Sequence, residues 1–222
     1  MFQSLVRFER SCCQSDLCGP TYTRHKNLVC TNSGQKPSVC EICGSTSCLT
    51  DPHSLPLPVE SAHTSTLFRS SRVARIAFIP SNPRNRLFDF NETYQWHCGV
   101  VDSVGRVHSY SERSGTQADF TGWSEVIVIN LPSVEFGFQN ITAWQWDQAI
   151  RGVGFRSSYF RCNPYIAAHD EHKKDCLDYV AAVIGSVVRN ETVDRTRVAS
   201  WLHSRLRYLC WYRDLQNKLN VS

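Results

Sequence analysis

The chain has 222 residues, and its 41% hydrophobic and 20% charged residues supply enough apolar material for a folded core and exclude wholesale disorder. Its formal net charge is only +4 and its basic residues are scattered, so a protein partner is favoured over nucleic acid. The longest apolar runs are far shorter than the roughly 18 to 20 residues that cross a bilayer, so no transmembrane segment is expected.

Residues 1–50 hold seven of the 11 cysteines and form a predicted Cys-rich appendage. No secretory signal is recognised, so the predicted location is intracellular, in the cytoplasm, where clustered thiols bind metal more often than they form disulfides. Cys40-Glu-Ile-Cys43, followed by a glycine, is half of a zinc site. We therefore predict one structural zinc held by Cys40 and Cys43 together with Cys18 and Cys13, with Cys12 and Cys30 as alternative ligands. Free thiols are the competing interpretation.

Residues 51–72 are rich in Pro, Ser and Thr and are expected to form a linker or a surface loop. The main domain is expected over 73–222 and begins with a strand at 75–80. The segment 95–111 predicts a hairpin, with strands at 96–101 and 106–111 and a turn at 102–105. A β-branched run at 125–131 predicts a buried strand, and 155–166 is a further strand candidate.

Three helices are expected in the rest of the chain. The first covers 140–150 with Asn140 as its cap, and the second covers 176–188 with Asp175 as its cap and Asp178 in its first turn. The third covers 197–219, and it shares with the second an apolar period of 3.6 residues. Strands in the middle and helices at the end predict the α+β class, with an antiparallel sheet packed on the 176–188 helix.

Two residues stand out as a candidate catalytic pair. Cys176 opens the second long helix, and a helix N-terminus stabilises a thiolate. His97 begins a strand that is expected to face this helix, so it is the candidate base. A packed structural cysteine and a hydrogen-bonded structural histidine are the alternative interpretation.

The position of His108 depends on the hairpin turn. If the turn spans 102–105, Val101 pairs with Arg106, and His108 lies on the same face of the sheet as His97, opposite Gly99. A bulged turn would place His108 on the other face.

The order of a strand histidine, a hairpin and a helix-start cysteine resembles the permuted papain-like fold of lecithin retinol acyltransferase-like proteins and of isopeptidases that act on ubiquitin-like conjugates. The segments that carry this resemblance are His97-Cys-Gly-Val100, His108 eleven residues later, and Asp175-Cys-Leu-Asp-Tyr-Val180. The resemblance implies that Cys176 is the nucleophile, His97 the base and His108 the residue that orients the base. Asp175 stands where the acyltransferase pattern has Asn.

A second resemblance covers most of the chain. The whole is similar to the animal family of the opposite-strand protein of the makorin-two locus, which implies an intracellular protein. The matching segments are Leu5-Val-Arg-Phe8, Cys40-Glu-Ile-Cys43-Gly44, His97-Cys-Gly-Val100, Gly105-Arg-Val-His-Ser-Tyr110, Gly122-Trp-Ser-Glu125, Trp146-Asp147, Asp175-Cys176 and Arg195-Thr-Arg-Val-Ala-Ser200.

Two classes of function follow. The first is a non-catalytic interaction module on a permuted papain-like fold, with a small Cys-rich appendage and a protein partner. The alternative is a cysteine hydrolase or acyltransferase that uses a Cys176/His97 dyad and a thioester intermediate. In that case amides at the start of the 176–188 helix would stabilise the oxyanion.

Overall fold

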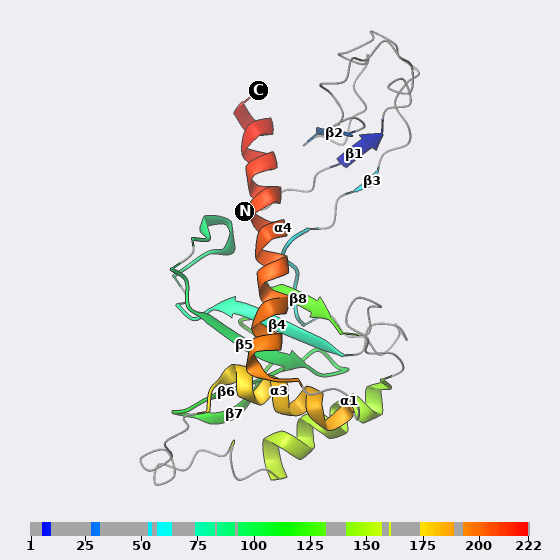
Figure 1. Cartoon of the computed structure of the whole chain (residues 1–222), viewed down its shortest axis with the longest axis vertical. Helices are drawn as coiled ribbons and strands as arrows, with labels where there is room; N and C mark the ends of the chain where they lie inside the picture. The colour runs from blue at the N-terminus through cyan, green and yellow to red at the C-terminus, as the bar shows by residue number, and fades with distance from the viewer. Residues whose placement is uncertain are drawn as a thin grey trace. The chain divides into compact units, whose positions relative to one another are not determined.

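The structure, a computed structural model, divides the chain into two compact units (Figure 1). One unit comprises Met1–Pro58 and Leu209–Ser222, and the other comprises Val59–Tyr208. The residues that the structure describes are 6–9, 28–31, 53–54, 57–63, 74–82, 84–91, 93–131, 141–156, 160, 174–188 and 193–221.

The first unit contains a three-stranded antiparallel sheet in the order β2-β1-β3. Its strands are β1 (Val6–Glu9), β2 (Leu28–Thr31) and β3 (His53–Ser54). Arg7 of β1 pairs with Cys30 of β2 on one side and with His53 of β3 on the other. The predicted zinc ligands Cys13, Cys18, Cys40 and Cys43 lie outside the described residues.

The second unit is built on a five-stranded antiparallel sheet in the order β7-β6-β5-β4-β8. Its strands are β4 (Arg75–Pro80), β5 (Trp96–Val101), β6 (Val107–Ser111), β7 (Gly115–Asp119) and β8 (Ile127–Asn130). The strands expected at 75–80 and 96–101 are confirmed, and β8 is a shorter form of the strand expected at 125–131. The sheet and the helices confirm the α+β class.

Part of the segment expected to be a linker is integrated into this unit. Glu60 forms an antiparallel bridge with Val126, with a backbone N–H to carbonyl distance of 2.9 Å. Ala62 is fully buried in a cluster with Trp123 and with apolar residues of the sheet. The second unit therefore begins at Val59, earlier than the expected start at residue 73.

The turn of the β5–β6 hairpin is longer than the turn at 102–105 that was expected first. Val101 pairs with Val107, and His108 lies opposite Val100. The Asp102 carboxylate organises this turn by accepting hydrogen bonds from the N–H groups of Val104 (3.1 Å) and Arg106 (2.8 Å). Paired residues share a face of the sheet, so His108 lies on the face of Val100. Val100 is three residues from His97, and side chains alternate along a strand, so His108 and His97 lie on opposite faces. The pairing of Val101 with Arg106 was wrong, and the bulged alternative describes the hairpin.

Gly99 allows β5 and β6 to approach each other closely. A Cβ atom at this position would lie 2.7 Å from the carbonyl oxygen of His108 and 2.8 Å from Cγ1 of Val107. Real Cβ atoms are not found at such distances, so any other residue would force the strands apart. The glycine therefore makes room for the backbone of β6.

The first helix, α1 (Ala143–Arg151), is followed by one π-helical turn at Gly152–Arg156. Thr142 caps α1 in a capping box with Gln145, so the helix begins later than the expected start near Asn140, which lies outside the described residues. The strand candidate at 155–166 is not formed at its described beginning, because Phe155 belongs to the π-helical turn.

The two remaining helices match their predictions closely. The helix α3 (Cys176–Val187) has a capping box between Asp175 and Asp178, as expected from the sequence. The helix α4 runs from Arg195 to Val221. None of the described helices is long and apolar enough to cross a membrane.

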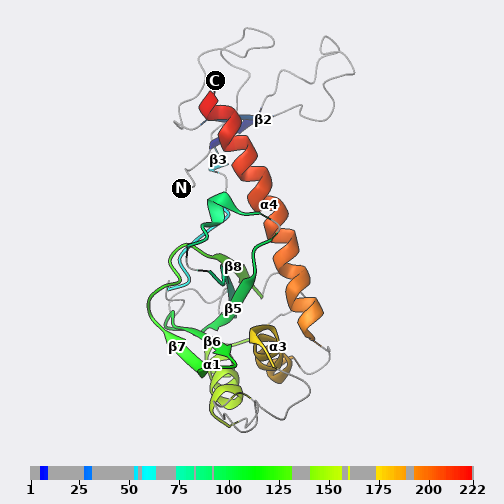
Figure 2. The same cartoon turned by 90° about the vertical axis from the view of Figure 1, so that its left-hand side faces the viewer.

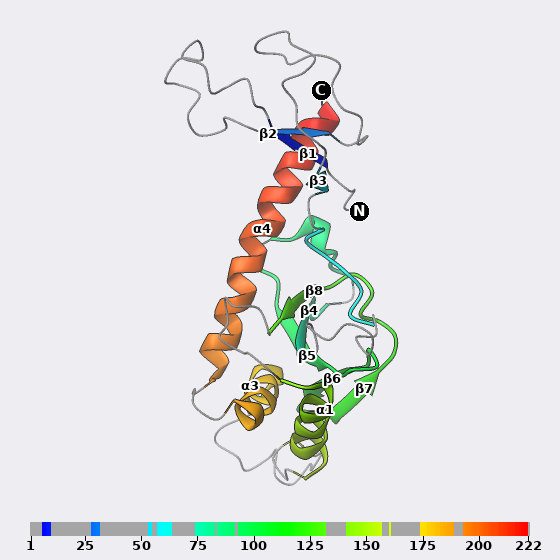
Figure 3. The ribbon, with the colours of Figure 1, turned by 90° about the vertical axis from the view of Figure 1, so that its right-hand side faces the viewer.

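The helices α1 and α3 lie side by side and pack against the sheet (Figures 2 and 3). Within the sheet, α3 contacts β5 and β6. An aromatic chain joins these layers, because the Phe160 ring lies 5.2 Å from the ring of Tyr110 on β6 and 5.3 Å from that of Tyr179 on α3. The N-terminus of α3 is thereby fixed beside the first residues of β5.

Candidate functional site

The site is centred on Cys176, the first residue of α3. Pairing between β5 and β6 covers only Gly99–Val101 of β5, so the preceding residues of β5 have no β6 partner in the described register. Helix α3 packs against both strands. The Cys176 sulfur forms hydrogen bonds with both Cys98 and His97, two neighbouring residues whose side chains leave opposite faces of β5.

Three donors surround the Cys176 sulfur. The Cys98 thiol, the His97 ring and the backbone N–H of Cys98 all form hydrogen bonds to it. The hydrogen bond from the Cys98 thiol is the largest influence, burial opposes it, and the His97 hydrogen bond and charge act with it. Together they lower the pKa of Cys176 from 9.0 to about 5. The sulfur is therefore a thiolate at neutral pH.

The shared proton of the two cysteines belongs to Cys98. Burial raises the pKa of the Cys98 thiol, and its hydrogen bond to Cys176 and the nearby negative charges of Cys176 and Asp175 raise it further. Cys98 is only 1% exposed, whereas Cys176 is partly exposed at a helix N-terminus and contacts an imidazole ring. The negative charge therefore resides on Cys176 and the hydrogen on Cys98.

Asp175 caps the helix without opposing the thiolate strongly. One of its carboxylate oxygens accepts from the N–H groups of Leu177 (2.9 Å) and Asp178 (3.1 Å), and the other forms an ion pair with Arg195. The carboxylate charge is thus directed at helix amides and a guanidinium. This is the orientation in which a carboxylate next to a nucleophilic thiol costs least.

The capping hydrogen bonds leave one backbone N–H at the start of α3 without a partner among the described residues. The N–H of Asp175 donates to the Asp178 carboxylate, and those of Leu177 and Asp178 donate to Asp175. Within the described part of the chain, no partner is found for the N–H of Cys176. It is the amide of the helix start that can donate to an oxyanion formed on a group attached to the Cys176 sulfur.

Trp123 supports His97 from the side. The two rings are 5.7 Å apart, centroid to centroid, at an angle of 39°. The Trp123 backbone N–H donates to Nε2 of His63 (3.3 Å), and Nδ1 of His63 donates to the carbonyl oxygen of Gly105 in the hairpin turn (3.0 Å). Sequence reasoning missed Trp123, His63 and Cys98 as parts of this site.

His108 belongs to a different cluster. Its Nε2 lies 3.0 Å from the Asp102 carboxylate, which also accepts from Nε of Arg106. Burial favours the neutral form of Asp102, but the hydrogen bonds from His108 and Arg106 outweigh it and lower the pKa of Asp102 to about 2. The expected role of His108 in orienting His97 does not fit, because the register places the two rings on opposite faces of the sheet.

The Asp102 cluster fastens the hairpin turn to α1. Ser103 donates to the Asp147 carboxylate through its N–H (3.0 Å) and through its hydroxyl (2.6 Å). Trp146 donates from its indole nitrogen to the carbonyl oxygen of Val101 (2.7 Å). This cluster has a structural role, since it fixes the end of the strand that carries His97 and Cys98.

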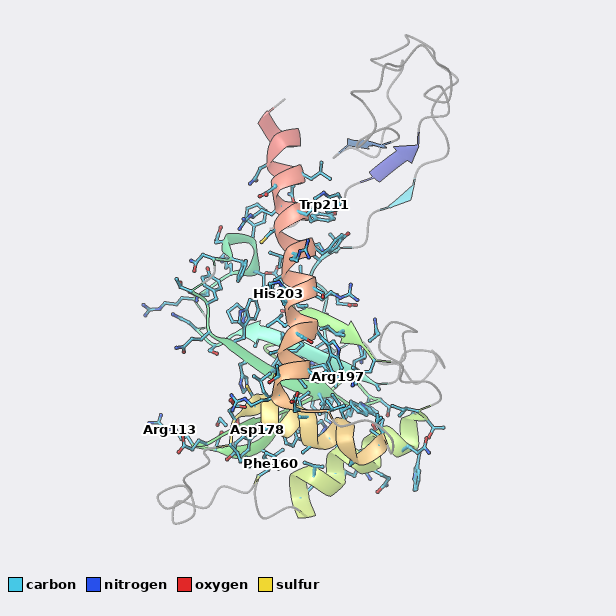
Figure 4. All side chains as sticks on the ribbon, viewed as in Figure 1. Arg113, Phe160, Asp178, Arg197, His203 and Trp211 are labelled. Carbon is cyan, nitrogen blue, oxygen red and sulfur yellow. The ribbon has the colours of Figure 1, made fainter. Side chains whose placement is uncertain are left out.

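A cavity of about 740 Å³ adjoins the start of α3. Its lining combines apolar residues of α3 with charged side chains, and neither Cys176 nor His97 belongs to it. Figure 4 labels Phe160 and Asp178, both of which line it. The complete lining is Val153, Phe160, Lys174, Asp178, Ala181, Ala182, Gly185, Val193, Asp194 and Arg195.

No cluster of three or more His, Cys, Asp or Glu side chains able to hold a metal ion occurs among the described residues. Fold and site together define an α+β protein with a cysteine–histidine pair where a helix begins beside a strand. Residues 52–212 match the sequence profile of the family described as DUF4796 C-terminal, so the chain belongs to this family. The match includes both Cys176 and His97. No curated protein and no solved structure matches the chain.

Proposed function

We propose that this chain is a cysteine-dependent acyl-transfer enzyme, a hydrolase or acyltransferase, with Cys176 as nucleophile and His97 as general acid and base. The observation that carries the proposal is the Cys176 sulfur, held at the start of α3 by hydrogen bonds from Cys98 and His97. A cysteine that serves only for packing needs no donors around its sulfur. For this reason the geometry favours catalysis over the non-catalytic interaction module.

The proposed reaction has two halves. The Cys176 thiolate attacks the carbonyl carbon of an ester, thioester or amide, and the Cys176 N–H donates to the resulting oxyanion. The bond to the leaving group then breaks, and the leaving group takes a proton from the His97 imidazolium. In the second half His97 removes a proton from water or from an acceptor hydroxyl or amine, whose oxygen or nitrogen attacks the thioester carbon. The Cys176 thiolate is released.

The order of His97, hairpin and Cys176 supports a relationship to permuted papain-like proteins. We also propose an intracellular location, because Cys98, Cys176 and Cys210 are free thiols, which persist in a reducing compartment.

The test is a single-turnover acylation assay on the full chain. The protein is mixed with a small ester such as p-nitrophenyl acetate or with an acyl thioester, quenched in acid and digested with trypsin. The peptide 175–189 contains Cys176 as its one cysteine, and the peptide 208–213 contains Cys210. We expect the acyl group on 175–189 well before it reaches 208–213.

Three variants make the result specific. Cys176→Ala should abolish acylation of 175–189, and His97→Gln should slow it by about 10²-fold or more, as for the loss of a general acid–base group. Cys210→Ala is the matched control and should react like the wild type. If the acyl group appears on 175–189 no faster than on 208–213, or if His97→Gln has no effect, the acyl-transfer proposal fails. The non-catalytic interaction module is then the better interpretation.

A further inference from the structure

The contact between Cys98 and Cys176 has no necessary part in acyl transfer. Cys98 lies on β5 and Cys176 at the start of α3, two elements that pack against each other. The Cys176 sulfur accepts hydrogen bonds from both the thiol and the backbone N–H of Cys98. The two thiols are therefore neighbours across the contact between β5 and α3, and both are free.

The two cysteines differ in exposure and in ionisation, and these are the properties that decide which of two thiols is oxidised first. Cys176 is partly exposed and ionised, whereas Cys98 is 1% exposed and protonated. A hydroperoxide reacts with thiolates, so it would attack Cys176 first. The product would form next to a second thiol that solvent does not reach.

We propose that Cys176 is a site of reversible oxidation by hydroperoxides and that Cys98 is its resolving cysteine, so that oxidation ends in a Cys98–Cys176 disulfide. The proposal concerns the thiol pair alone and does not depend on acyl transfer. It assigns to Cys98 a role other than packing.

The proposed chemistry balances in two steps. The Cys176 thiolate attacks one peroxide oxygen, the O–O bond breaks, and the alkoxide or hydroxide that leaves takes a proton from the His97 imidazolium or from water. Cys176 becomes a sulfenic acid, and the peroxide is reduced by two electrons. The Cys98 sulfur then attacks the Cys176 sulfur, the S–O bond breaks, and the hydroxide leaves as water with the proton of Cys98. A dithiol reductant restores both thiols.

Formation of the disulfide requires a small movement. The sulfurs must approach from a hydrogen-bonded separation to about 2.0 Å, with the two side chains at a torsion near 90°. The start of α3 is held by its capping box and by the Asp175–Arg195 pair, whereas Cys98 is fixed in a central strand of the sheet. The helix start therefore has to move toward the strand.

The experiment uses the full chain, reduced, freed of reductant and treated with a small molar excess of hydrogen peroxide. Free thiols are alkylated, and the protein is digested without reduction. Each half of the expected product contains a single cysteine, because the tryptic peptide 87–106 holds Cys98 and the peptide 175–189 holds Cys176. We expect these two peptides to be joined by a disulfide that dithiothreitol removes.

Variants identify the role of each cysteine. With Cys98→Ala the linked pair should be lost, and dimedone should trap a sulfenic acid on 175–189. With Cys176→Ala the peptide 87–106 should remain reduced, and with Cys210→Ala the link should form as in the wild type. The wild-type measurement stands without any variant, and thermal melting shows which variants are folded.

Two results would overturn the proposal. One is a wild-type protein in which Cys176 proceeds to sulfinic acid as fast as in Cys98→Ala, with no link between the two peptides. The other is a disulfide that joins Cys176 to a different cysteine. Failure of the acylation assay would leave this result unchanged, and formation of the disulfide would not by itself support acyl transfer.

Discussion

The reaction of Cys176 with an aromatic disulfide reagent should be fast and nearly independent of pH above about pH 6. With a pKa of about 5, lowered first by the Cys98 hydrogen bond, Cys176 is about 90% thiolate at pH 6. A thiol with the ordinary value of 9.0 is about 0.1% thiolate at that pH, so the fraction of reactive form differs by about 10³-fold.

The lower basicity of Cys176 offsets part of this advantage. The nucleophilicity of a thiolate falls with its pKa with a Brønsted coefficient of about 0.4–0.5, which over a difference of about four in pKa costs about 40- to 100-fold. The ionised fraction is the larger effect. Cys176 should therefore react about 10- to 20-fold faster than an ordinary accessible thiol at pH 6. Its advantage should disappear by about pH 7, and at higher pH the ordinary thiol, as it ionises, should become the faster of the two.

The assay is peptide-resolved labelling of the full chain between about pH 4 and pH 9, with quantification of 175–189 against 208–213. The rate at Cys176 should rise through about pH 5 and then level off, whereas the rate at Cys210 should continue to rise. His97→Ala should move the midpoint for Cys176 upward, because it removes one donor and a positive charge. A rate at Cys176 that still rises tenfold per pH unit between pH 6 and pH 8 would refute the thiolate and with it the proposed nucleophile.

Three further predictions concern stability and metal. Gly99→Ala should lower the free energy of unfolding by about 1–3 kcal/mol in denaturant titrations because the new methyl group collides with β6, whereas Gly185→Ala, in α3 where a Cβ meets nothing within 4 Å, should leave it unchanged or raise it; equal effects would contradict the close approach of the strands. Asp102→Asn should lower the free energy of unfolding by about 2 kcal/mol at neutral pH, because folding lowers the pKa of the wild-type carboxyl group from 3.8 to about 2. This stabilisation is complete above pH 4 and is lost as the pH falls toward 2. In acid titrations the difference in stability between the two proteins should therefore narrow over that interval, and a constant difference would refute the prediction. Elemental analysis of protein purified without chelators should find about one zinc per chain, and Cys40→Ala with Cys43→Ala should remove it; zinc near zero in the wild type would reject the metal site.

The elements carried by local signals could be predicted from the sequence. The strand 75–80 is a short apolar run that ends at Pro80, and the helix at 176 has an apolar period of 3.6 residues. Asp175 with Asp178 forms the capping box that begins α3. The polar strand β7 (Gly115–Asp119) was missed, because its sequence GTQAD has no apolar alternation. The start of α1 was misplaced because Thr142 and Gln145 form a capping box that fixes the start of the helix.

The candidate site could be predicted only in part. A helix-start cysteine and a strand histidine are visible in the sequence, but their contact depends on where β6 stops pairing with β5. That limit is set by the Asp102 turn, whose hydrogen bonds displace the register by one residue and move His108 to the other face. The contribution of Cys98 follows from the same geometry, since only an N–H without a strand partner can donate to the Cys176 sulfur.

The thiolate of Cys176 is assembled from segments that are distant in the sequence, since its donors lie at the start of β5 and the sulfur at the start of α3. Strands β5, β6 and β7 follow one another along the chain and can pair early, whereas the docking of α3 closes a much longer loop. Until that docking occurs, Cys176 is an ordinary thiol in an unfolded segment. Pulse labelling of Cys176 during refolding at about pH 6 would therefore report when α3 docks on the sheet, because the labelling rate of this native thiol changes at that step.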